Sequence, residues 1–284
     1  MLLNPLKIHT PTTLQEAVTL YKSLENVKIH AGGTFLLSSL KLSKRKGSKT
    51  PENVISLSKI NDLKGITADR EKLVIKAMTT IDDLQHSSFL EDNFSVLKTV
   101  CKNISTQPIR NMATVGGNLT CRYTWTEMPA VMVGLNAALH FLGKDGQEEI
   151  QAAEDFYKNQ AKTDKILSHI VINRDPSAVI AYQRVKKSQF VDIPLLSLII
   201  KTMIVKNKWT NTRVAVNNCV QFAQRDKMLE DFLNNKSLQK EIAKEALDHI
   251  DNTIYDTRSS DYKKYMFRVC IHDALQEIIK RGSP

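Results

Sequence analysis

The sequence predicts an α+β protein made of three consecutive units, at residues 1–58, 59–172 and 173–284. A chain of 284 residues exceeds the size at which a single hydrophobic core usually stops growing. Short helical and strand patterns alternate up to about residue 172, whereas longer strand patterns followed by helical ones occupy the rest. A hydrophobic fraction of 42% and a charged fraction of 25% are ordinary for a globular protein.

The first unit is predicted to be a small α/β unit. Thr13 and Glu16 form a capping box, and apolar residues at helical spacing follow as far as Leu24. Residues 27–31 alternate as a strand that leads into Gly32–Gly33, and residues 53–57 read as a second strand. The basic stretch 40–50 between them is expected to be a solvated loop, because no aromatic residues interleave with its lysines to stack on nucleic-acid bases.

The second unit is predicted to mix strands and helices. Residues 73–78 read as a strand, a helix starts near Asp82, and Leu97 to Ile104 form a helical stripe. After the second glycine pair, Gly116–Gly117, Thr126 is expected to cap a helix over residues 127–138. Residues 139–150 read as a hairpin with an Asp-Gly turn.

The third unit is predicted to be an antiparallel sheet followed by helices. Its strands are expected at residues 179–185, 193–205 and 213–220, with a tight connection at residues 205–209. Residues 226–250 and 261–281 are expected to be helical.

Charge and cysteine content limit the partners, the metal sites and the compartment that the sequence predicts. The net charge of +10 is spread along the whole chain and therefore favours no particular anionic partner. The four cysteines form no CxxC pair, so neither a structural zinc nor an iron–sulfur cluster is expected in this chain. The N-terminal residues lack a signal-peptide pattern and no apolar run is long enough to span a membrane, so we expect a cytoplasmic protein.

Two glycine pairs, Gly32–Gly33 and Gly116–Gly117, are the feature that bears on function. Glycine lets backbone N–H groups approach an anion closely, so two such loops could hold one pyrophosphate between them. Ordinary turn glycines are the alternative for each pair taken alone. The ten glycines nowhere follow the GxGxxG spacing, and the one Gly-Lys pair, Gly143–Lys144, is followed by Asp, so Rossmann and Walker loops are excluded. HExxH and GxSxG motifs are also absent.

The residues around both pairs give a more specific signal. The chain resembles the FAD-binding (medium) subunit of the molybdenum hydroxylases, the family of xanthine and carbon monoxide dehydrogenases. The resemblance rests on Ala31-Gly32-Gly33-Thr34-Phe35-Leu36 and on Ile109-Arg110-Asn111-Met112-Ala113-Thr114-Val115-Gly116-Gly117-Asn118-Leu119, and it extends over nearly the whole chain. It implies a two-part PCMH-type FAD-binding region, residues 1–58 and 59–172, followed by a C-terminal α+β domain.

The resemblance also implies the site residues, with no catalytic side chain and no metal ligand in this chain. The first loop would wrap the FAD pyrophosphate, through Ile29, His30, Ala31, Gly32, Gly33, Thr34, Phe35 and Leu36. The second loop would hold the other side of the phosphates and the ribityl chain, through Thr114, Val115, Gly116, Gly117 and Asn118. Ile104 and Leu167 would flank the isoalloxazine ring, with Arg184 as a basic residue near it and Glu127 as a further contact.

Three positions depart from the family pattern. Phe35 stands where Asp is usual, Tyr123–Thr124 replaces a Ser-Pro stretch, and Glu127 replaces an Asp. Glu127 also has a local interpretation, because acidic residues favour the first turn of a helix. Tyr123 and Trp125 could line the flavin, line a subunit interface, or simply pack at a helix entry.

The function implied is electron transfer through FAD. The chain would take electrons from [2Fe–2S] clusters in a small partner subunit, fed by a large molybdopterin-binding subunit, and pass them to a soluble acceptor. NAD, a quinone, ferredoxin and oxygen are all open as that acceptor. A standalone FAD-dependent oxidoreductase of the same fold is the alternative, and a basic nucleic-acid-binding protein is a third hypothesis that no motif supports.

Overall fold

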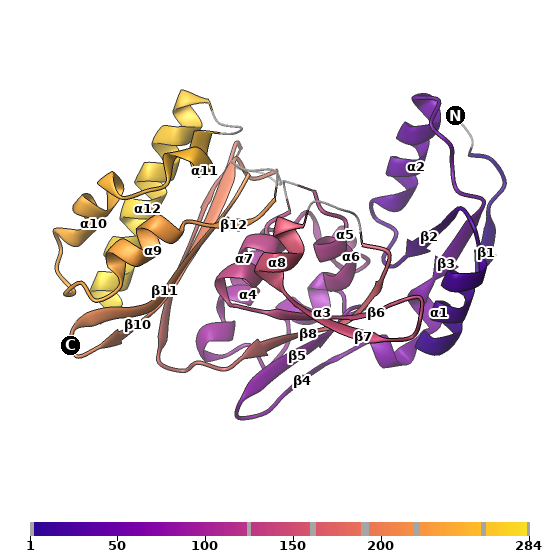
Figure 1. The fold of residues 1–284 in the computed structure, drawn as a ribbon, viewed down its shortest axis with the longest axis horizontal. Helices are drawn as coiled ribbons and strands as arrows, with labels where there is room; N and C mark the ends of the chain where they lie inside the picture. Colours follow the sequence, from indigo (N-terminus) through magenta and orange to yellow (C-terminus); the bar gives the residue numbers. More distant parts are fainter. Residues whose placement is uncertain are drawn as a thin grey trace.

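Three sheets follow one another along the chain and mark the three parts of the molecule (Figure 1). The computed structural model describes residues 3–123, 126–159, 163–188, 193–218, 222–256 and 260–282. The five-stranded sheet lies in the middle, between the N-terminal sheet and the C-terminal sheet with its helices (Figure 1). The predicted α+β class is confirmed.

The N-terminal sheet is small and parallel, with strand order β1-β3-β2. Its strands are β1 (Lys7–His9), β2 (Val27–His30) and β3 (Asn53–Ser56), and its helices are α1 (Leu14–Ser23) and α2 (Leu36–Arg45). The capping box of α1 is confirmed, since the Thr13 hydroxyl accepts from the Glu16 amide at 3.1 Å. Strand β2 lies at the edge of the sheet and ends just before Gly32.

The prediction of a solvated loop at residues 40–50 is wrong for its first half. Helix α2 continues to Arg45, and it buries Leu40 while its lysines lie on the outer face. The apolar residues Leu36 and Leu40 are one helical turn apart, which places them on the same side. The dense run of lysines concealed this spacing.

The central sheet is antiparallel, with order β4-β5-β8-β6-β7. Alternate residues of β5 and β8, such as Leu73, Ile75, Ile170 and Ile172, are fully buried against the helices. The strands are β4 (Ile66–Ala68), β5 (Lys72–Lys76), β6 (Ala138–Leu142), β7 (Glu148–Ala152) and β8 (Ile166–Asn173). The helices are α3 (Ile81–Gln85), α4 (Val96–Asn103), α5 (Gln107–Arg110), α6 (Val115–Thr120), α7 (Met128–Gly134) and α8 (Ala153–Lys158).

Two boundaries in this unit differ from expectation, while the β6–β7 hairpin is confirmed. Glu127 rather than Thr126 occupies the N-cap position of helix α7, without a side-chain cap hydrogen bond, and the helix ends at Gly134. It stops early because Asn136 adopts a φ of 57°, after which the chain enters β6. Ile104 lies just beyond α4 as its C-terminal cap rather than within the helical stripe.

The C-terminal sheet is antiparallel, with order β12-β11-β10-β9. Its strands are β9 (Ala178–Val185), β10 (Leu196–Val205), β11 (Lys208–Asn217) and β12 (Gln224–Arg225). Lys206 and Asn207 both have positive φ, as a two-residue type I′ turn requires, which confirms the predicted tight connection. The last residues of the strand expected at 213–220 lie outside the described residues.

The α-helices that follow this sheet in the described residues are α9 (Lys227–Leu233), α10 (Ile242–Glu245), α11 (Asn252–Asp256) and α12 (Asp261–Gly282). Helix α12 lies across β9 and β10 (Figure 1). The single helix expected at residues 226–250 is wrong, because the chain breaks at Asn234. The Asn234 side chain accepts from the Thr212 amide at 3.0 Å, and Asn235 has a φ of 72°.

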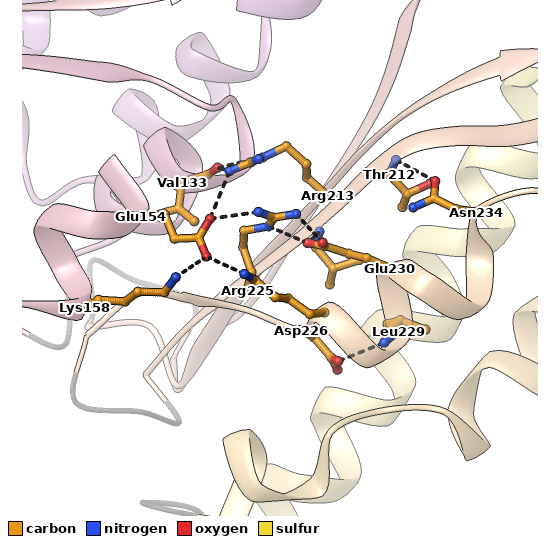
Figure 2. A network of polar contacts seen from close by, with 12 residues as sticks. Val133, Glu154, Lys158, Thr212, Arg213, Arg225, Asp226, Leu229, Glu230 and Asn234 are labelled. Atoms are coloured by element: carbon orange, nitrogen blue, oxygen red, sulfur yellow. Dashed lines mark hydrogen bonds and ion pairs between the residues drawn. The ribbon is translucent and has the colours of Figure 1, made fainter. Parts of the chain in front are cut away.

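A charged network joins the central unit to the C-terminal one (Figure 2). Glu154 of α8 pairs with Lys158 at 2.9 Å and with Arg225 of β12 at 2.8 Å, and Arg225 also binds Glu230 of α9. Burial alone would raise the pKa of Glu154, but the hydrogen bonds from Arg225 and Lys158 outweigh it and lower this pKa to about 2. The carboxylate therefore stays charged and holds the two units together.

Candidate FAD-binding cleft

A large cleft opens between the N-terminal and central units. Its volume is about 1290 Å³, and Pro194 and Phe222 of the C-terminal unit complete its wall. Pockets for ordinary small molecules measure roughly 300–1,000 Å³, so this cleft suits a longer ligand. Both glycine loops line it.

The first loop presents backbone amides to the cleft. It connects the end of β2 to the start of α2, and Gly33 adopts a φ of 71° within it. In the described part of the chain, the amides of Gly32, Gly33 and Thr34 form no hydrogen bond. Helix α2 adds the amides of its first turn, to which no side-chain cap hydrogen bond is made within the described residues. Such a cluster of N–H groups at a helix N-terminus is suited to phosphate.

The amides of the second loop are already used within the protein. Val115 donates to the Thr79 carbonyl at 2.9 Å and Gly116 to the Ala77 carbonyl at 2.8 Å. Gly117 donates to the Thr114 hydroxyl at 3.1 Å, and Asn118 to the Thr114 carbonyl at 2.9 Å. Among the described residues, the amides of the first loop are therefore open, whereas those of the second loop are used by the protein itself.

Glycine is needed at two positions because other backbone lies too close. A Cβ on Gly32 would lie 1.9 Å from the carbonyl oxygen of Met112, which belongs to the opposite wall. A Cβ on Gly116 would lie 2.7 Å from the Ala77 carbonyl oxygen. The two glycine pairs thus let α6 pack onto the end of β5 and let the first loop lie directly against the second.

Asn118 carries an unsatisfied polar atom into the cleft. Its side-chain oxygen is buried and has no hydrogen-bond partner among the described residues. Buried polar atoms in native proteins almost always have a partner. A hydroxyl of a bound ligand would supply one, so this residue fits a polyhydroxylated cofactor chain.

The structure brings nearly all of the predicted site residues together. They line the cleft at Ile29, Ala31, Gly32, Gly33, Thr34, Phe35, Leu36, Ile104, Thr114, Gly116, Gly117, Asn118, Glu127 and Leu167. His30, Val115 and Arg184 are not among the lining residues. The His30 ring supports the first loop from below, since its Nε2 would lie 2.5 Å from a Cβ on Gly33. Val115 is fully buried.

Arg184 lies behind the cleft wall, where it binds Glu127. The Arg184 Nε and the Tyr182 hydroxyl each donate to the same Glu127 oxygen at 2.6 Å. Glu127 and the Arg184 side chain are only 3% and 5% exposed. Burial raises the pKa of Tyr182 well above its usual value, and the neighbouring Glu127 charge raises it further. Glu127 therefore does not act as a local helix cap, because strand β9 holds its carboxylate.

Several lining residues were not anticipated. Ser39 and Ser43 of α2 contribute polar groups to the cleft, as do Asn103 at the end of α4 and Ser105 just beyond it. The serines share the helical spacing of Leu36 and Leu40, so recognition of α2 as a helix would have revealed them. Tyr123 lines the cleft, whereas Trp125 lies outside the described residues.

Other kinds of site find no support in the described part of the chain. Within the described ranges, no group of three His, Cys, Asp or Glu side chains is arranged to hold a metal ion. None of the helices in those ranges combines the length and the apolar character that a membrane span requires.

Comparison with known proteins identifies the family. A family model described as the FAD binding domain in molybdopterin dehydrogenase matches residues 4–174. The glyceraldehyde dehydrogenase medium chain of Sulfolobus acidocaldarius is 22% identical over 94% of this chain and 95% of its own length. The carbon monoxide dehydrogenase medium chain of Hydrogenophaga pseudoflava is 26% identical over 94% of each chain.

Solved structures show the same fold along the whole chain. Reconstituted CO dehydrogenase from Oligotropha carboxidovorans superimposes with a TM-score of 0.86 at 26% identity, covering 99% of this chain and 100% of that one. Carbon monoxide dehydrogenase from Hydrogenophaga pseudoflava gives a TM-score of 0.87 at 24% identity over 99% of both chains. The chain therefore belongs to the FAD-binding (medium) subunits of the molybdenum hydroxylase family.

Proposed function

We propose that this chain binds one FAD in the cleft and passes electrons from a partner's [2Fe–2S] clusters to a soluble acceptor. The observation that carries the proposal is the set of open amides at Gly32–Thr34 and at the start of α2, facing the second loop across the cleft. The amides and the helix N-terminus favour a negatively charged pyrophosphate. Bound FAD would supply the redox chemistry, which no protein side chain provides.

The residues divide the work of holding the cofactor. The first loop would bind the pyrophosphate through backbone N–H groups, and Asn118 would bind the ribityl chain through its buried side-chain oxygen. Ile104 and Leu167 would flank the ring with apolar surface. Glu127 would form part of the wall near the ring, held in place by Arg184 and Tyr182. The second loop would act by close packing rather than through its amides.

Partner subunits are part of the proposal. Relatives of this chain are named medium chains of carbon monoxide and glyceraldehyde dehydrogenases, which supports a complex with a small [2Fe–2S] subunit and a large molybdopterin-binding subunit. Around the cleft, Leu37, Met112 and Ile193 are more than half exposed, and exposed apolar side chains often mark protein contacts.

We further propose the reducing cytoplasm as the compartment, since Cys101, Cys121 and Cys270 are free thiols.

We also propose domain boundaries near residues 58 and 172. The separation of the three sheets along the chain supports them, since β3 ends at Ser56 and β8 at Asn173. Limited proteolysis with mass analysis of the fragments would test these boundaries. Cleavage within β5 or β10 that is faster than cleavage near residues 58 and 172 would contradict them.

Purification of the full chain tests the central proposal. The protein should be yellow, should release FAD on denaturation, and should rebind FAD after its removal. A colourless protein that takes up no FAD would refute the proposal. Purification from its native source under gentle conditions should also recover molybdenum and iron with the chain, whereas FAD without either metal would favour a standalone flavoprotein.

A further inference from the structure

Two aromatic rings meet where the glycine loops face each other. Phe35 directly follows the first loop and Tyr123 follows the second, and both line the cleft. Their ring centroids are 4.2 Å apart with an angle of 52° between the planes. These are two of the positions at which the chain departs from the family pattern, so the two departures form a single contact.

Arg122 fixes the backbone that carries Tyr123. Its φ of 54° is unusual for a residue other than glycine, and its guanidinium lies 4.9 Å from the Phe156 ring and 4.5 Å from the Phe222 ring. The guanidinium also donates to the Asn159 carbonyl. Arg122 is therefore anchored on α8 and on the C-terminal unit, while the next residue contacts the N-terminal unit.

We propose that Phe35 and Tyr123 form an aromatic clasp that holds the two loops together over bound FAD and slows its release. This inference rests on the proposed function. A dinucleotide held by both loops leaves only when the loops separate, and their separation breaks the ring contact. Aromatic pairs stabilise a structure beyond the apolar area that they bury. Arg122 also lines the cleft, and in this proposal it is a positioning residue that acts through Tyr123.

The FAD dissociation rate of the full chain tests the clasp. Phe35→Leu and Tyr123→Leu should each release FAD about two- to tenfold faster than the wild type, because each loses the ring contact. The double variant should be no faster than the faster single variant, since both changes remove the same contact. Tyr123→Phe keeps the ring and should release FAD at the wild-type rate. Phe89→Leu, which alters an exposed aromatic residue outside the cleft, is the matched control.

Arg122→Ala distinguishes an effect on the position of Tyr123 from an effect on the stability of the whole fold. It should accelerate FAD release when Tyr123 is present and have no further effect in the Tyr123→Leu background. Circular dichroism and the Tm of every variant establish that it is folded. Equal rates in all variants, or additive effects of Phe35→Leu and Tyr123→Leu, would overturn the clasp while leaving FAD binding intact. A wild-type chain that binds no FAD would instead refute the proposed function.

Discussion

Replacement of Gly32 by alanine should separate the two walls of the cleft. The added Cβ would lie 1.9 Å from the Met112 carbonyl oxygen, whereas contacts below 3.0 Å are essentially never seen for a real Cβ. The loops would therefore have to part by about 1 Å or more. Because the obstacle is backbone rather than the end of a flexible side chain, no rotamer change can relieve it.

The magnitude follows from the cost of forcing an extra methyl group into packed structure. Overpacking of this kind costs roughly 1–3 kcal/mol. If FAD binding requires the closed loops, that cost weakens the FAD dissociation constant by about 5- to 150-fold. Titration calorimetry with FAD on the apo chain measures this change directly.

A glycine with strain but no obstacle supplies the control. Gly47 has a φ of 71°, and a Cβ added there would meet no atom within 4 Å. Gly47→Ala should lower the Tm, since a left-handed alanine costs roughly 1–2 kcal/mol, but should leave FAD affinity unchanged. Equal FAD affinity in Gly32→Ala and the wild type would refute the inference that the loops must touch.

Four other substitutions test the ion pairs and the titrating side chains. Glu127→Gln leaves the buried Arg184 with a neutral partner and should lower the free energy of unfolding in urea by about 3 kcal/mol. Asp92→Asn should cost less than about 1 kcal/mol, because the Asp92 side chain is 42% exposed and its partner Arg174 is 20% exposed. Glu154 has a folded pKa of about 2 against an ordinary 4.5, so its stabilisation is present above pH 4.5 and is lost as the pH falls towards 2. The stability difference between wild type and Glu154→Gln should shrink over that range, and a constant difference would contradict it. Burial, with His140 nearby, lowers the pKa of His169 to about 4 from 6.5, so the unfolded chain binds more protons and stability falls between pH 6.5 and 4. His169→Gln should flatten that part of the stability profile, as followed by thermal unfolding.

The sequence predicted local features well because local chemistry determines them. The Thr13 capping box, the Asp-Gly hairpin and the turn at Lys206–Asn207 each depend on residues close together in the chain. The two glycine pairs were recognised for the same reason. Fourteen of the residues predicted to hold the cofactor line the cleft.

Contacts between residues that are far apart in the sequence could not be predicted from local patterns. Arg184 lies 57 residues from Glu127 in sequence, and nothing near either residue indicates that they bind each other. The amides of the second loop look available in sequence, but carbonyls of Thr79 and Ala77 accept two of them. Helix α2 was missed because Lys41, Lys44 and Arg45 give its second half the look of a basic loop, and Leu40 is the residue that it buries.

These differences change the physical account of the two glycine pairs. Gly33 serves its own loop through a positive φ, whereas Gly32 and Gly116 serve the contact between segments through their missing side chains. Electrostatic attraction for an anion therefore falls to the first loop and α2, while the second loop supplies a rigid surface. A shift of α6 would break its hydrogen bonds to Ala77 and Thr79, so we infer that the first loop and α2 are the side that moves when a ligand enters or leaves. The Phe35–Tyr123 contact lies across that moving boundary, which is where a contact can control the rate of release.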